Sequence, residues 1–176
     1  MKNLIFNTTV LIFTLNIVFG CSYTNKYAKR VFKDRVFIAK EFLNYSIIRS
    51  RGKNTVILDI YKSKLKNRFF FQKGKENEYV VSKDSIEYDK EHFNDKTVYG
   101  KELISFLKKK IQIMDDYDIR DVSCEFRNQG IDMKIYFNSL DVLLYVSDSK
   151  VIKNEEWMKY LKGLKKLNEN WYYEYN

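Results

Sequence analysis

The stretch Ile131-Asp-Met-Lys-Ile-Tyr-Phe137 decides the fold class, because its side chains alternate between two kinds along the chain. Positions 131, 133, 135 and 137 are apolar, whereas positions 132, 134 and 136 carry a charge or a hydroxyl. A period of two is typical of a strand that has one face on a core and the other in water. The stretch therefore predicts an antiparallel sheet with one solvated face.

Further β-branched and aromatic runs predict the rest of this sheet. The expected strands are Thr55–Tyr61, Asn67–Gln72, a third strand or broken pair at Tyr79–Val81 and Ser85–Tyr88, Arg120–Arg127, Ile131–Asn138, Val142–Val146 and an edge strand in the tail Trp171–Tyr175. The segments Asn128-Gln-Gly130 and Ser139-Leu-Asp141 predict the turns between the later strands. Short connections of this kind join neighbouring antiparallel strands.

Three segments have apolar residues at helical spacing and predict helices at about 24–47, 101–115 and 155–168. Asn154 is placed to cap the last of them, and the polar residues 89–98 predict a loop. The resulting order, α-βββ-α-βββ-α, predicts an α+β fold. We expect a meandering antiparallel sheet with helices packed on one face.

The composition excludes several classes of protein. The chain has 176 residues, of which 45% are hydrophobic and 31% charged, so one folded domain is expected rather than a disordered chain. Two cysteines are too few for a disulfide scaffold, and one histidine, His92, cannot form a multi-histidine metal site. No cofactor is expected from any motif in the sequence.

The first twenty residues have the pattern of a secretory signal. Met1-Lys-Asn is followed by a mostly apolar run from Leu4 to Phe19 and then by Gly20-Cys21-Ser22. The ending Val18-Phe-Gly-Cys21 resembles the lipobox of bacterial lipoproteins. The resemblance implies that Cys21 receives a diacylglyceryl group and becomes the first mature residue. An uncleaved anchor, or an ordinary signal peptide beside a chance cysteine, is the alternative.

This resemblance implies a location and a domain organisation. Residues 1–20 would be a lipoprotein signal peptide, and residues 21–176 a single α+β domain held at the membrane of the cell envelope. Ser22 after the cysteine favours the outer membrane, and the next residues lack the acidic cluster of some surface-exported lipoproteins. The periplasmic face of the outer membrane is therefore expected in a cell with two membranes.

Positive charge is concentrated beside the expected anchor. Residues 22–53 contain nine Lys or Arg against two acidic residues, a net charge of +7, in a chain whose total is +9. This segment predicts a basic N-terminal helix that contacts anionic headgroups. The candidate contact residues lie off the apolar stripe and are Lys26, Lys29, Arg30, Lys33 and Lys40. Codon bias that simply fills a solvated face with lysine is the alternative.

Four carboxylates gather near the end of the second predicted helix, at Asp115, Asp116, Asp118 and Asp121. A helix C-terminus disfavours negative charge, so this placement works against local stability and can mark a site. A basic protein partner is favoured over Ca²⁺, because the Gly and the distant Glu of an EF-hand loop are missing. A solvated turn balanced by Lys108, Lys109 and Lys110 is the alternative.

Three other features favour structural roles. Cys124 alternates with Val122 and Phe126, which predicts a buried and chemically quiet thiol. His92 lies in a polar stretch that predicts an exposed loop. The basic run from Lys62 to Lys75 contains Phe69–Phe71, a combination found in nucleic-acid binders, but the expected secretion favours a strand pair with a solvated lysine face and no nucleic-acid partner.

The sequence therefore predicts a lipid-anchored envelope protein that acts as a non-catalytic protein-binding module. Two versions are an envelope-complex subunit and an immunity-type inhibitor, with a protein partner whose identity the sequence does not name. No nucleophile elbow, P-loop or zinc motif is present. The alternative is an envelope enzyme with a carboxylate-based site at residues 115–121.

Overall fold

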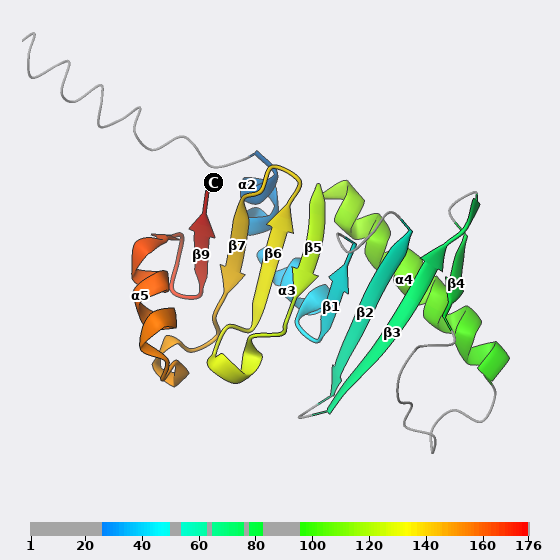
Figure 1. Cartoon of the computed structure of the whole chain (residues 1–176). Coiled ribbons are helices and arrows are strands. Elements are labelled where there is room, and N and C mark those ends of the chain that lie inside the picture. Colours follow the sequence, from blue (N-terminus) through cyan, green and yellow to red (C-terminus); the bar gives the residue numbers. More distant parts are fainter. Residues whose placement is uncertain (1–25, 50–53, 63–64, 76–77, 83–95, 176) are drawn as a thin grey trace, which may run out of the picture.

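One open antiparallel sheet organises the part of the chain that the computed structural model describes, residues 26–49, 54–62, 65–75, 78–82 and 96–175. Its nine strands lie in the order β4-β3-β2-β1-β5-β6-β7-β9-β8 (Figure 1). Helices pack against this sheet, so the α+β class expected from the sequence is confirmed. Cys21, His92 and residues 85–88 lie outside the described residues.

The first half of the chain builds one side of the sheet. Two short helices, α2 (Lys26–Lys33) and α3 (Arg35–Phe42), precede a four-strand meander. Its strands are β1 (Tyr45–Ile48), β2 (Thr55–Lys62), β3 (Leu65–Lys73) and β4 (Tyr79–Val81). They run outward from the middle of the sheet to its β4 edge.

The prediction of one helix over 24–47 was wrong at its C-terminal end and at Asp34. Residues 45–48 form β1, which pairs with both β2 and β5. Tyr45 fits the helical spacing, but Tyr45 and Ile47 also alternate with Ser46, and pairing on both edges favours the strand. At Asp34 the helix is interrupted, although the amide of Ile38 still donates to the carbonyl oxygen of Asp34 at 3.0 Å.

The second half starts with α4 (Lys96–Asp116), which crosses behind β2, β3 and β4 in Figure 1. The chain returns to the centre of the sheet as β5 (Ile119–Ser123), followed by the 3₁₀ turn η2 (Arg127–Gln129), β6 (Met133–Phe137) and β7 (Val142–Tyr145). Helix α4 begins at residue 96, inside the stretch 89–98 that was predicted as a loop. Strand β5 ends at Ser123 rather than at Arg127, because the chain turns into η2.

The C-terminal segment adds η3 (Ser149–Val151), α5 (Glu155–Gly163), β8 (Lys165–Lys166) and β9 (Trp171–Glu174). The Asn154 side chain caps α5 as predicted, accepting from the amides of Glu156 at 2.9 Å and Trp157 at 3.1 Å. The helix ends at Gly163 and not at residue 168, consistent with the poor helix propensity of glycine. The tail is a strand, but it lies between β7 and β8 and is not an edge.

Helices cover both faces of the sheet, which corrects the prediction that they share one face. The main core joins α2, α3 and α4 to one face, whereas α5 packs over a second cluster on the other. Neighbouring residues show the division: Leu143 belongs to the main core and Leu144 to the second cluster. The reason is the uninterrupted apolar run Val142–Leu144, which makes β7 buried on both faces.

Candidate functional site

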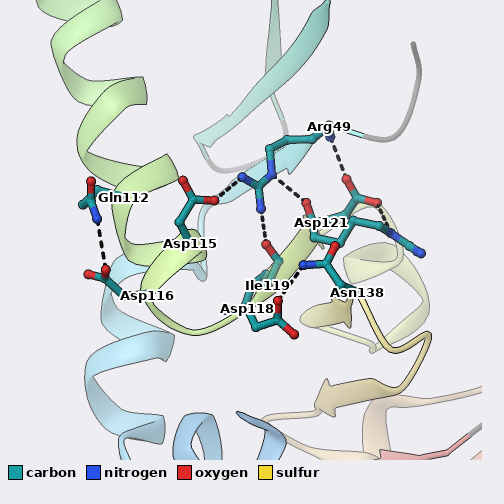
Figure 2. A network of polar contacts seen from close by, with 9 residues as sticks. Arg49, Gln112, Asp115, Asp116, Asp118, Ile119, Asp121 and Asn138 are labelled. Carbon is teal, nitrogen blue, oxygen red and sulfur yellow. Dashed lines mark hydrogen bonds and ion pairs between the residues drawn. The ribbon is translucent and has the colours of Figure 1, made fainter. Parts of the chain in front are cut away.

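The acidic segment 115–121 is organised by Arg49, a residue that directly follows β1 (Figure 2). The Arg49 Nη1 atom lies 2.5 Å from an Asp115 carboxylate oxygen. Its Nε donates to the Arg120 carbonyl oxygen at 2.9 Å, and its Nη2 donates to the Ile119 carbonyl oxygen. The backbone amide of Arg49 donates to Asp121 Oδ1 at 2.6 Å. One residue therefore contacts both ends of the acidic segment.

The other carboxylates of the segment also have structural partners. Asp121 is buried and accepts from Arg120 Nε at 3.0 Å. Asp118 has a φ of 55°, in the left-handed region, and accepts from the Asn138 side chain at 2.7 Å. Asp116 accepts from Gln112 Nε2 at 3.0 Å. The segment is thus a folded turn with internal hydrogen bonds, in which Asp115 and Asp116 are the exposed members.

Cations from the N-terminal segment offset the unfavourable placement of acids at the end of α4. Arg30 Nη1 donates to the Asp116 carbonyl oxygen at 2.9 Å, and its guanidinium lies 4.6 Å from the centre of the Tyr117 ring. Positive groups at a helix C-terminus interact favourably with its free carbonyls. Arg30 and Arg49 together supply positive charge at the end of α4, where Lys110 is instead paired with Glu41.

These contacts give the cluster a structural explanation. Within the described residues, no group of three or more His, Cys, Asp or Glu side chains is placed to hold a metal ion. Two cavities on the described surface are lined by other residues and include none of the four aspartates. What the arrangement offers chemically is the exposed edge formed by Asp115 and Asp116, which suits a basic partner.

Cys124 is fully buried, as its alternation predicted, and it is a free thiol. Its Sγ atom lies 3.4 Å from the Tyr45 carbonyl oxygen, and its amide donates to Ser46 Oγ at 2.7 Å. Burial raises the pKa of the thiol to about 12, which is the opposite of what a nucleophile needs. Phe126, predicted on the same face, packs instead with the second cluster because the strand has ended.

The predicted membrane-contact residues Lys26, Lys29, Arg30, Lys33 and Lys40 are all exposed on α2 and α3. The opposite side of these helices contributes Ala28, Val31, Ile38 and Phe42 to the main core. Arg30 differs from the lysines because it is engaged with Asp116 and Tyr117.

In β3, Arg68 forms a double contact with Asp59 on β2 at 2.7 and 2.8 Å, which supports the predicted strand pair.

A second charged feature, which sequence reasoning missed, surrounds Lys134 on β6. Its Nζ atom lies 5.4 to 5.6 Å from the centres of four aromatic rings, those of Phe126, Tyr136, Trp157 and Tyr160. We name these five residues the caged-lysine surface. All five are half-buried. Lys134 was predicted only to point to the solvated face, because nothing in the local sequence places α5 above it.

Burial and neighbouring charge set the chemistry of the caged-lysine surface. Burial lowers the pKa of Lys134, and the negative charge of Glu174 opposes this shift. Tyr160 donates to Glu174, and burial together with that hydrogen bond raises the pKa of the phenol. Ring faces attract an ammonium ion, more strongly where water is displaced. Among the described residues Lys134 has no carboxylate within ion-pair distance.

Comparisons of the chain with protein-family models, curated proteins and solved structures found no match. In the described ranges, none of the helices combines the length and the apolar character that crossing a bilayer requires.

Proposed function

We propose that this chain is a lipid-anchored, non-catalytic protein-binding module of the bacterial cell envelope, either an envelope-complex subunit or an immunity-type inhibitor. The expected location is the periplasmic face of the outer membrane in a cell with two membranes. The lipobox-like sequence at residues 18–21 supports the anchor. No cofactor and no nucleic acid enter this proposal.

The caged-lysine surface is the observation that carries the binding role. Tyrosine and tryptophan side chains are enriched at the energetic centres of protein interfaces, and this surface contains two tyrosines and one tryptophan. The rings support one another, with centroids 5.1 Å apart for Phe126 and Trp157 and 5.5 Å apart for Trp157 and Tyr160. Such a surface is preorganised, which lowers the entropic cost of association. Lys134 suits a carboxylate of the partner.

The exposed edge of the acidic segment, Asp115 and Asp116, is a second contact region for a basic part of the partner. The alternative function, an envelope enzyme with a carboxylate-based site at 115–121, has less support. Asp121 and Asp118 are bound to neighbouring groups, and the cavities that we describe lie elsewhere. General acid–base chemistry needs a carboxylate within reach of a substrate proton.

Affinity purification of the intact lipoprotein from its own membranes tests the proposal. Wild type, Lys134→Gln and a matched control, Lys153→Gln, are compared by mass spectrometry of the co-purifying proteins. Lys153 is exposed and lies just before α5. We expect a partner with wild type and with the control, reduced by at least about tenfold with Lys134→Gln, as for a typical hot spot. Unchanged recovery with Lys134→Gln would contradict the assigned surface.

A further inference from the structure

Helix α3 exposes an apolar pair that is flanked by lysines of α2 and α3. Val36 is 78% exposed, the highest value among the large hydrophobic side chains of the described residues, and Phe37 is 44% exposed. Lys33 and Lys40 line the same shallow groove as this pair. Lys29 lies on the same exposed side, one helical turn before Lys33. We call Lys29, Lys33, Val36, Phe37 and Lys40 the α2–α3 docking face.

The acidic residues nearby are engaged with other groups. Asp34, which also lines the groove, accepts from the Tyr117 hydroxyl at 2.7 Å. Glu41 pairs with the buried Lys110 at 2.7 Å, and this contact lowers the pKa of the Glu41 carboxyl. Asp34 keeps its negative charge, because the Tyr117 hydroxyl is neutral, but the three lysines outnumber it and leave the α2–α3 docking face with a net charge of +2 around its apolar centre.

From this arrangement we infer that the α2–α3 docking face lies on an anionic lipid bilayer, with Val36 and Phe37 entering the interface and the three lysines meeting lipid phosphates. Basic helices with apolar residues between the charges bind membranes in this way. Lysine is depleted at protein interfaces, whereas its long stem lets the ammonium reach headgroups while the helix lies deeper. An anionic bilayer therefore fits this face better than a protein does.

The position of the face in the chain gives independent support, and here the inference rests on the proposed anchor. Lys26 follows Cys21 by five positions, a reach of at most about 18 Å for an extended chain. A lipid on Cys21 would therefore keep α2 near the bilayer. Helices α2 and α3 cover one side of the sheet and α5 covers the other. Docking through the exposed side of α2 and α3 would therefore turn α5 and the caged-lysine surface away from the membrane.

The test uses the full chain with one added cysteine, Val36→Cys, reconstituted into neutral phosphatidylcholine vesicles or into vesicles that also contain anionic phosphatidylglycerol. A membrane-impermeant thiol reagent is added, and labelling at position 36 is quantified by peptide mass spectrometry. Val151→Cys is the matched control, since Val151 is 57% exposed on η3, beside the second cluster. Cys124 is buried and adds no signal.

We expect labelling of Val36→Cys to be at least about tenfold slower in anionic than in neutral vesicles, as for a residue at the headgroup level. Replacing Lys29, Lys33 and Lys40 by Gln should remove this protection, and Val151→Cys should label equally in both. Equal labelling of Val36→Cys in both vesicles overturns the inference. Protection in both, which would indicate a second copy of the chain, also overturns it.

The same samples separate this inference from the proposed anchor. The mass of the N-terminal peptide reports whether Cys21 carries lipid, independently of labelling at position 36. Unmodified Cys21 with a protected position 36 would remove the anchor and leave the docking face. Lipidated Cys21 with an unprotected position 36 would support the anchor and overturn the docking face.

Discussion

Replacing Arg49 by alanine should cost about 3.5 kcal/mol of unfolding free energy, mostly because its guanidinium donates charge-assisted hydrogen bonds to two backbone carbonyls worth about 1.5 kcal/mol each. This is the low end of the range, chosen because the side chain is 23% exposed. The ion pair with Asp115 adds only about 0.5 kcal/mol, since the carboxylate is 55% exposed. The bond from the Arg49 amide to Asp121 survives the substitution.

Urea unfolding of the chain from Ser22 onward, followed by the fluorescence of Trp157 and Trp171, measures these differences. With a slope of about 2 kcal/mol per molar urea, the midpoint of Arg49→Ala should fall by about 1.7 M. Asp115→Asn should cost only about 0.5 kcal/mol, and the double-mutant coupling should be of the same size. Arg49→Lys keeps the charge but loses the fork, so about 2 kcal/mol is expected.

Two results would refute this reasoning. A loss below about 1 kcal/mol for Arg49→Ala would mean that the bonds to the Ile119 and Arg120 carbonyls contribute little net stability. If Asp115→Asn lost as much unfolding free energy as Arg49→Ala, the stabilisation would come from the ion pair and not from the hydrogen bonds to the two backbone carbonyls.

Three further predictions concern single positions. Cys21→Ala should release the protein from membranes or leave the precursor uncleaved, and unchanged processing with unchanged detergent partitioning would remove the lipoprotein assignment. Cys124 should react slowly with a thiol reagent in the folded protein and rapidly in urea. Burial raises the pKa of this thiol from 9.0 to about 12, so its contribution to stability is present below pH 9 and is lost as the pH rises toward 12. Cys124→Ala should therefore flatten the stability–pH profile between these two pH values. Gly130→Ala should destabilise by about 1–3 kcal/mol, because φ is +90° and a Cβ would lie 2.6 Å from Ile152 Cγ1; an unchanged melting curve would contradict this.

Much of the sheet could be predicted from the sequence, because strand patterns are local. The alternation at 131–137 identified β6, and the Asn154 cap marked the start of α5. The errors lie where two local patterns compete. Tyr45–Ile48 fits a helix by spacing and a strand by alternation, and only pairing with β2 and β5 decides between them.

The candidate sites were predictable only in part. The acidic segment is visible in the sequence because its carboxylates are adjacent, but the residues that neutralise it, Arg30 and Arg49, are 86 and 66 positions away from Asp116 and Asp115. The caged-lysine surface joins Phe126 from the turn before η2 with residues from β6 and from α5. Its pattern exists only after folding, so no spacing rule could have found it.

The sequence by itself determined the antiparallel strands, the buried Cys124, the exposure of the lysines on the first helices and the expectation of a lipid anchor. Each follows from periodicity, or from residues next to one another in the chain. The tertiary structure decided which face α5 covers, how the acidic turn is balanced and which aromatic rings surround Lys134. These depend on long-range contacts, and a charge or ring from a distant element acts on a site only once the sheet has brought the two together.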